Sequence, residues 1–319
     1  MPYILRRLFS LVVSLFLISL VTFVIVHVVP GDPAMLILGH EASPEQLAGL
    51  RASLGLDRPL PLQYLTWLAG AVHGDLGQSL RHHLPVSQLI AERLPVTASL
   101  AALSLLLAVA IALPLGILAA VKDGSPLAYG ALALSQAGAA VPAFWIGILL
   151  ILLLAVQNRV FPTGGYVPWS ESPFGALRSL ALPAVALGLP LAAVLVRLVR
   201  GSLLDELAQD HIQTARAKGL PERAILLRHA LRGALLPTVT MLGLQLGFLV
   251  GGSVVIEQVF ALPGLGRLTL FAIANRDIPL MQGLVMFIAT LVVAINLGVD
   301  LLYAVLDPRI SLWRPAGRG

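Results

Sequence analysis

The sequence predicts an all-α integral membrane protein with six transmembrane helices. Of its 319 residues, 58% are hydrophobic and only 12% are charged, whereas soluble domains carry about a quarter charged residues. The mean hydropathy is +0.90. Apolar runs long enough to cross about 30 Å of hydrocarbon recur six times along the chain. These features exclude an ordinary soluble domain.

Composition also limits the chemistry that the chain can perform. Cysteine is absent, so there is no disulfide framework, thiolate metal site or cysteine nucleophile. The only lysines are Lys122 and Lys218, and neither lies in the G-x-x-x-x-G-K-[ST] pattern of a P-loop. We therefore predict no catalytic, cofactor-binding or metal-binding residue in this chain. The net charge of +5 needs no nucleic acid to explain it, because cytoplasmic loops of membrane proteins collect Lys and Arg.

The first domain, residues 1–30, is predicted to be a cytoplasmic N-terminus followed by the first transmembrane helix. Its apolar run, Leu8 to Val29, exceeds the roughly 7–15 residues of a cleavable signal peptide, and it ends in the turn sequence 30–33. Residues 31–96 form a predicted external segment. Within it, Ser43-Pro44-Glu45-Gln46 predicts a capping box at the start of a helix that Gly55 ends.

Residues 97–308 are predicted to form a five-helix core, followed by a cytoplasmic tail, 309–319. Prolines inside the spans predict kinks, which serve either motion during transport or static packing. The expected spans are Leu100–Val121, Ala131–Val156, Leu180–Val199, Leu235–Ile256 and Gly283–Leu306.

Basic residues predict the orientation. With the N-terminus inside, thirteen Lys and Arg fall on inner segments and eight on outer ones. Four of those eight belong to the long external segment, which counts little toward topology. Both termini are therefore expected in the cytoplasm.

The longest polar stretch between spans runs from Asp205 to Pro237. Gly219 suits the left-handed position past a helix end, and Pro221 suits the start of a second helix. A DNA-binding helix-turn-helix has a similar pattern, but membrane spans flank this stretch on both sides. A solvated connecting loop is the other alternative, and apolar residues such as Ile225 and Leu231 argue against it.

This stretch resembles the cytoplasmic loop of bacterial ABC-importer permeases of the dipeptide/oligopeptide/nickel branch. The matching residues run from Asp210 to Leu220 and from Leu227 to Arg232, followed by Leu236-Pro237. The wider superfamily has Glu-Ala-Ala where this chain has Gln213-Thr214-Ala215. The resemblance implies that this loop, residues 200–236 of the core, docks an ATP-binding subunit. The residues implied are Asp210, Thr214, Ala215, Arg216, Lys218, Gly219, Ile225, Arg228, His229 and Leu231.

A second stretch, 257–283, resembles the external hairpin of the same permeases, so the resemblance extends from about Arg6 to Arg309. It implies the type I ABC importer permease fold. The residues that match are Glu257, Phe260, Pro263, Gly264, Gly266, Arg276 and Asp277.

Polar residues inside the spans are few. Gln136, Gln245 and Asn296 either face a translocation pathway or tie helices together, and the sequence does not separate these roles. Asp300 lies toward the cytoplasmic end of the last span, where we expect a structural role.

The resemblance implies one permease half of a binding-protein-dependent importer in the bacterial inner membrane. Its partners would be membrane lipid, a second homologous permease, two ATP-binding subunits that hold ATP and Mg²⁺, and an extracytoplasmic substrate-binding protein. Dipeptides or oligopeptides are the expected substrates, although nickel, glutathione and oligosaccharides are carried by close relatives. The alternative class is an ion-coupled secondary carrier, which would show internal repeats or a buried carboxylate site. A membrane-embedded enzyme is a third class, and no catalytic constellation supports it.

Overall fold

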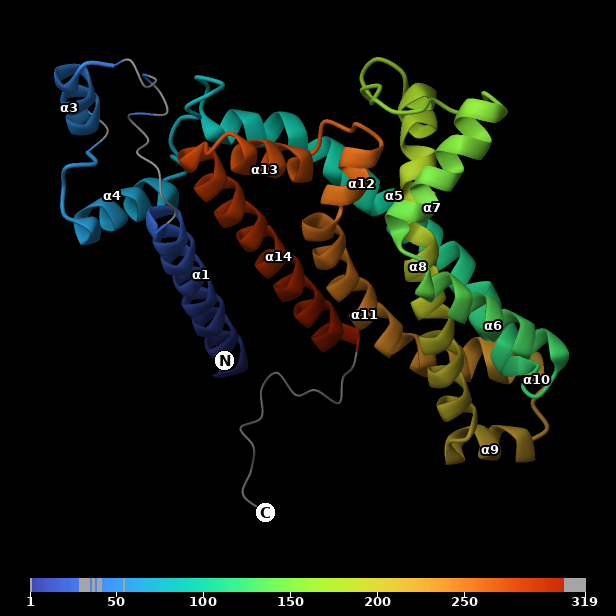
Figure 1. Cartoon of the computed structure of the whole chain (residues 1–319). Coiled ribbons are helices and arrows are strands. Elements are labelled where there is room, and N and C mark those ends of the chain that lie inside the picture. Colours follow the sequence, from blue (N-terminus) through green and yellow to red (C-terminus); the bar gives the residue numbers. More distant parts are fainter. Residues whose placement is uncertain (1, 29–34, 36–37, 39–41, 54, 307–319) are drawn as a thin grey trace. The chain divides into compact units, whose positions relative to one another are not determined.

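The computed structural model describes residues 2–28, 35, 38, 42–53 and 55–306, and within these ranges helices and turns account for the chain (Figure 1). An isolated bridge joins Gln78 and Pro85. The helices are α1 (Pro2–Val28), α3 (Pro44–Ser53), α4 (Leu60–Val72), α5 (Val86–Val121), α6 (Pro126–Ala140), α7 (Ala143–Leu150), η1 (Ile151–Gln157), α8 (Pro173–Leu207), α9 (Asp210–Ala217), α10 (Glu222–Ala224), η2 (Ile225–Ala230), α11 (Leu231–Gly252), α12 (Val254–Val259), α13 (Leu265–Ala274) and α14 (Ile278–Leu306).

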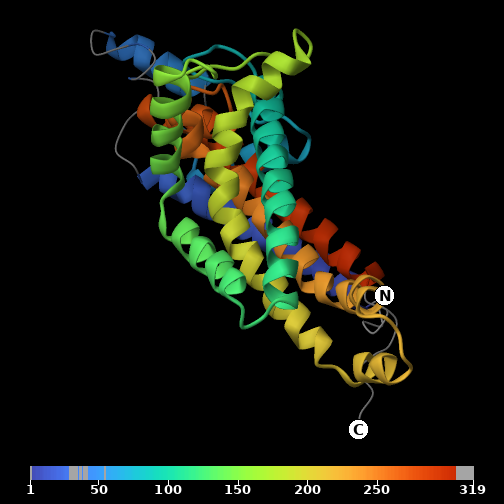
Figure 2. The ribbon, with the colours of Figure 1, turned by 90° about the vertical axis from the view of Figure 1, so that its right-hand side faces the viewer.

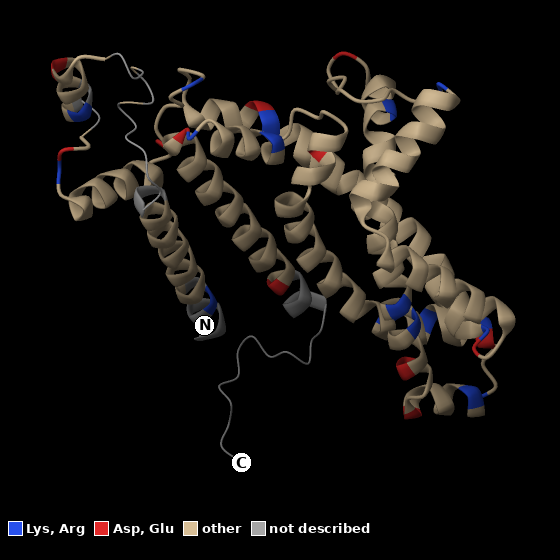
Figure 3. Ribbon diagram, in the orientation of Figure 1, with Lys and Arg blue, Asp and Glu red and all other residues tan. Residues whose placement is uncertain are grey.

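Four of the six predicted spans correspond to single long apolar helices in the described part of the chain. Four stretches of the described chain are long and apolar enough to cross a membrane: α5, α8, the run from Glu222 to Gly252, and the α14 residues up to Leu301. α1 holds a shorter apolar stretch, Phe9–Ile25. Charged side chains lie mostly near helix ends and in the connecting turns, as Figure 3 shows. This distribution confirms an all-α membrane protein.

The span expected over residues 131–156 differs from a single helix. It is a pair of helices, Pro126–Ala140 and Ala143–Gln157, bent by 96° at the break between them. Pro142 causes the break, because proline pushes the residue before it out of the helical region. Val141 accordingly has φ −88° and ψ 126°. A kink at Pro142 was predicted, but its size was not.

Contacts divide the chain into two compact units. The first contains residues 1–95 and 264–293, and the second contains residues 96–263 and 294–319. In the first unit α1 packs on α4 around the buried Tyr64, whose hydroxyl lies 2.8 Å from that of Ser19. The capping box is confirmed, because Ser43 and Gln46 exchange side-chain hydrogen bonds with each other's backbone N–H. The predicted turn at 30–33 and the tail 309–319 lie outside the described residues.

α8 is the central helix of the second unit and packs against α6, α7 and α11 (Figure 2). It also approaches α5 closely at two glycines. A Cβ atom on Gly116 would lie 2.8 Å from Val199, and one on Gly188 would lie 2.9 Å from the Ser104 carbonyl oxygen. Small residues let membrane helices pack this closely. Because α8 is packed inside this unit, it fixes where the polar segment at its C-terminal end lies.

Candidate functional site

The candidate site is the coupling hairpin, which we define as residues 205–237. The chain leaves α8, forms α9, turns, and enters α10, η2 and α11 (Figure 1). Gly219 lies just past α9 with φ +77°, the left-handed conformation that favours glycine. Pro221 is extended and immediately precedes α10. The predicted helix–Gly–helix pattern is confirmed, with the second helix beginning one residue after the proline.

Apolar side chains hold the hairpin against the ends of the membrane helices. Ile212 of α9 and Ile225 of η2 are fully buried, together with Ala120 of α5 and Leu203 of α8. At about 25 cal/mol per Å² of apolar surface, burial of each isoleucine contributes roughly 1.5–3 kcal/mol. The hairpin is therefore part of the packed core of its unit and not a solvated connector.

Ion pairs brace the hairpin on its exposed side. The Arg216 guanidinium spans the glycine turn and donates to both carboxylate oxygens of Glu222, at 2.8 and 3.3 Å. His211 Nε2 lies 3.2 Å from Glu206 Oε1. The Glu206 carboxylate in turn occupies the space beside Gly233, where a Cβ atom would approach within 2.5 Å. These contacts tie α9 to α10 and the end of α8 to α11.

Burial divides the residues predicted to dock a partner into two groups. Ile225 is fully buried and Ala215 is 8% exposed, and for these two residues a docking role stays a prediction. They hold the hairpin to the membrane helices, and Leu231 packs beside them. The predicted residues that face outward are Asp210, Thr214, Arg216, Lys218, Gly219, Arg228 and His229.

Two exposed leucines on the same hairpin were not among the predicted site residues. Leu220 is 40% exposed and Leu227 is 55% exposed. Leu227 lies one helical turn after Arg223, in the π-helical turn η2. The spacing of Ile225 and Leu227 in the sequence did not show which of these two side chains faces inward. A π-helical turn changes the number of residues per turn and so changes which side chains share a face.

The second predicted site contains a buried acid, Glu257 of α12. Glu257 is fully buried, and its Oε1 accepts hydrogen bonds from Thr97 Oγ1 at 2.7 Å and Ser253 Oγ at 2.9 Å. Thr97 belongs to α5 and lies 160 residues away in sequence. A buried charge is tolerated where such donors compensate it. Glu257 therefore links α12 to α5.

Asp277 makes a similar link in the other unit. It precedes α14 and accepts from the Leu280 N–H, which caps that helix. Its carboxylate also accepts from Ser79 Oγ and from the N–H groups of Leu80 and Arg81, at 2.5, 3.1 and 3.2 Å. Asp277 is 1% exposed. It fixes the turn before α5 to the start of α14.

The remaining predicted residues of the second site, the stretch 257–283, shape its backbone. Phe260 is buried, and its carbonyl oxygen accepts from the Gly165 N–H at 2.9 Å. Pro263 and Gly264 immediately precede α13, and Gly264 is extended. Gly266 lies within α13 and is buried. Arg276 has φ +51°, a left-handed conformation that is uncommon for a side-chain-bearing residue. A short helix, α13, follows this turn.

Residues 112–312 match the family described as "Binding-protein-dependent transport system inner membrane component", and residues 1–101 match its N-terminal companion. The chain belongs to this family. It is 41% identical over 335 residues to the dipeptide transport system permease protein DppB of Escherichia coli K12, with 97% of this chain and 98% of that protein covered. A Brucella suis biovar 1 protein named as a peptide transport system permease is 45% identical over 307 residues, covering 96% of this chain and 98% of its own.

Solved structures support the same architecture. The inward-facing MetNI methionine ABC transporter aligns with a TM-score of 0.57 and 21% identity, over 69% of this chain and 97% of the matched chain. At that identity the likeness shows the fold. The family and the relatives show that this permease is an inner-membrane component of an ABC importer, and the structural likeness shows that it has the fold of such permeases.

The three polar residues predicted to face a pathway have different surroundings in this permease. Gln136 is exposed and accepts a hydrogen bond from the Arg197 guanidinium, which ties α6 to α8. Gln245 and Asn296 are half-buried, and Asn296 Oδ1 has no hydrogen-bond partner within the described part of the chain. Gln136 therefore ties two helices together, and a pathway role stays a prediction for all three residues.

Potential metal ligands do not cluster in the part of this permease that the structure describes, since no group of three or more His, Asp or Glu side chains there could hold an ion. Its acids and histidines instead form hydrogen bonds and ion pairs, such as those of Glu257 and His211.

Proposed function

We propose that this permease forms half of the translocation path for dipeptides or oligopeptides across the inner membrane. Relatives whose names specify peptide or dipeptide transport match it along nearly its whole length. Its partners would be a second homologous permease, two ATP-binding subunits that hold ATP and Mg²⁺, and an extracytoplasmic substrate-binding protein. The chain itself contributes no nucleotide site.

The observation that carries the mechanism is the packing of the coupling hairpin. One face of the hairpin, with Ile212 and Ile225, is buried against α5 and α8. Outside that packing, Leu220 and Leu227 are exposed, and exposed basic residues such as Lys218 and Arg228 lie beside them in the sequence. Exposed leucines flanked by basic residues suit docking to a partner. The ATP-binding subunit would hold this exposed surface.

Movement of the partner would then reach the membrane helices directly. The hairpin continues without a break from α10 through η2 into α11, and the Glu206 contact with Gly233 joins the same region to α8. Arg200 adds a second tie, donating to Asp123 at 2.5 Å at the loop after α5. Closure of the ATP-binding subunits would therefore displace the ends of three spans together and switch the direction in which the path opens.

Uptake by the reconstituted importer tests this function. Proteoliposomes would hold this chain with its partner subunits, ATP inside, and the substrate-binding protein outside. We expect ATP-dependent accumulation of a labelled dipeptide. Accumulation of nickel, glutathione and an oligosaccharide is measured in separate parallel assays. Accumulation of one of these with no dipeptide uptake would overturn the peptide assignment, and uptake without ATP would overturn the importer mechanism.

A further inference from the structure

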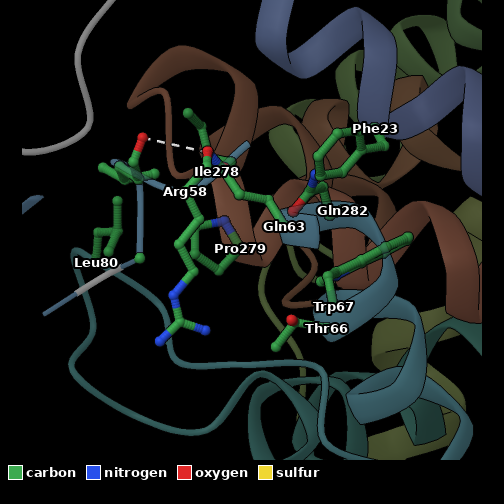
Figure 4. Close-up of a pocket in the computed structure, with 11 residues that line it drawn as sticks. Phe23, Arg58, Gln63, Thr66, Trp67, Leu80, Ile278, Pro279 and Gln282 are labelled. Atoms are coloured by element: carbon green, nitrogen blue, oxygen red, sulfur yellow. Dashed lines mark hydrogen bonds between the residues drawn. The ribbon is translucent and has the colours of Figure 1, made fainter. Parts of the chain in front are cut away.

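A cavity of about 260 Å³ lies within the unit formed by residues 1–95 and 264–293. It is bounded by α1, α4, the turn before α4 and the start of α14 (Figure 4). Phe23 and Trp67 form an aromatic side of it, with ring centroids 6.3 Å apart. Phe23 lies near the end of the apolar stretch 9–25 of α1. The cavity therefore lies near one end of the apolar stretch of α1.

Two hydrogen-bond donors in the wall of this cavity have no partner in the described part of the chain. Gln282 is 5% exposed, and its Nε2 makes no hydrogen bond there; the indole Nε1 of Trp67 is buried and makes none. A buried donor left unpaired costs about 1–3 kcal/mol. Both groups donate, so a ligand that satisfies them must present acceptors.

The cavity is also positively charged. Arg58 lines it, and Figure 4 shows its guanidinium extended along the side away from Phe23 and Trp67. Gln63 Nε2 donates to the Arg58 carbonyl oxygen at 2.8 Å, which holds the turn that carries the arginine. The nearby Asp277 carboxylate is already occupied by its four donors.

An apolar groove lies farther along the same helices. It has a volume of about 710 Å³ and belongs to the same unit. Met286 of this groove is one helical turn beyond Gln282 on α14, and Phe16 is two turns before Phe23 on α1. The groove is lined mainly by apolar side chains, among them Val12, Leu15, Leu68, Ile90, Leu94 and Phe287.

We propose that this unit binds an anionic phospholipid. The headgroup phosphate would accept from Gln282 Nε2, Trp67 Nε1 and the Arg58 guanidinium, and an acyl chain would lie along the apolar groove. The cavity is smaller than the roughly 300–1,000 Å³ typical of small-molecule sites, which suits one phosphate group and not a whole ligand. Arginine and aromatic side chains at the membrane interface fit this chemistry.

Lipid binding to the purified importer tests the proposal. The full chain with its partner subunits is delipidated in detergent, and binding of dioleoyl phosphatidylglycerol is measured by native mass spectrometry. Gln282→Leu and Arg58→Ala should each weaken binding about tenfold, since each removes a bond to a charged group. Gln88→Leu and Arg81→Ala are the matched controls, because both side chains are exposed in the same unit, and they should leave binding unchanged.

Two further ligands separate a lipid from a free phosphate. Glycerol 3-phosphate carries the phosphate without acyl chains, and phosphatidylcholine carries it without net charge. We expect both to bind at least about tenfold more weakly than phosphatidylglycerol. Equal binding of glycerol 3-phosphate would overturn the role of the groove. Unchanged phosphatidylglycerol binding in both Gln282→Leu and Arg58→Ala would overturn the site itself; Arg58 is exposed, so its variant does not depend on refilling a core.

Discussion

Glu257 shows how a single buried acid can be stabilised between two helices. Its Oε1 accepts from Thr97 and Ser253, and all three residues are at most 1% exposed. The resemblance identified Glu257 as part of a motif. It did not identify Thr97, because a single sequence does not show that two residues 160 positions apart are in contact. The same holds for Asp277 and Ser79, which are 198 positions apart.

Thr97→Val tests this contact at the residue scale. Valine keeps the shape of threonine and removes the hydroxyl, so the buried carboxylate loses one donor. The free energy of unfolding should fall by about 1–3 kcal/mol, seen as a lower Tm in detergent. The matched control is Thr240→Val, whose hydroxyl bonds only the Leu236 carbonyl oxygen within its own helix. If both variants melt at the same temperature, the buried contact does not stabilise the protein.

Among the helices, regular spans were predictable and irregular ones were not. Long apolar runs and Gly219 follow from composition and backbone preference, and the structure confirms both. Pro142 predicts a kink in its span but not the 96° bend that the structure has there, and the π-helical turn η2 has no distinct composition. The size of the bend and the π turn depend on packing around α8 and on which side chains reach the core. The inward position of Ile225 is a consequence of that packing.

Gly219→Val separates backbone strain from crowding in the coupling hairpin. A Cβ atom at this position would meet nothing within 4 Å, so the cost is conformational, on the order of 1–3 kcal/mol at φ +77°. The strain should change how α9 meets α10. We expect the variant to insert into the membrane at a normal level, to retain little of the ATP-binding subunit in a pull-down, and to lose substrate uptake.

Gly219→Asn is the control for that variant, because asparagine adopts the left-handed conformation more readily than valine. It should retain the ATP-binding subunit and most uptake. If Gly219→Val retains both in full, the hairpin is a connector and does not couple the subunits.

Gly243→Ala tests the crossing of α11 with the end of α14. An added Cβ at Gly243 would overlap the Val299 side chain, whereas one at Gly251 of the same helix meets nothing within 4 Å. Gly243→Ala should lower the free energy of unfolding by about 1–3 kcal/mol through overpacking. Gly251→Ala should not lower the free energy of unfolding, because no atom crowds its Cβ and alanine has a better helix propensity than glycine. Thermal melts of the two purified variants provide the comparison, and a Gly243→Ala melt as high as that of Gly251→Ala would contradict this crossing.

At the scale of the whole molecule, the charge distribution and the hairpin lead to one arrangement in the membrane. If the coupling hairpin docks ATP-binding subunits, as we propose, it lies in the cytoplasm, where ATP is. Helices α8 and α11 leave and enter it, so the proposal predicts that their opposite ends and the segment before α8 face outward. The excess of Lys and Arg on the same side as the hairpin independently predicts this orientation.

Topology reporters test this arrangement directly. Tags at residue 125, between α5 and α6, and at the C-terminus should be accessible only from the cytoplasm. Tags near residues 60 and 168 should be accessible only from outside, because an odd number of crossings separates each of them from the hairpin. The measurement is labelling of intact cells and of inverted membrane vesicles with an impermeant reagent, with an untagged chain as the control. Labelling of residue 60 from the cytoplasmic side would place the cavity of Gln282 and Arg58 in the inner leaflet, and it would also reverse the first span relative to the hairpin.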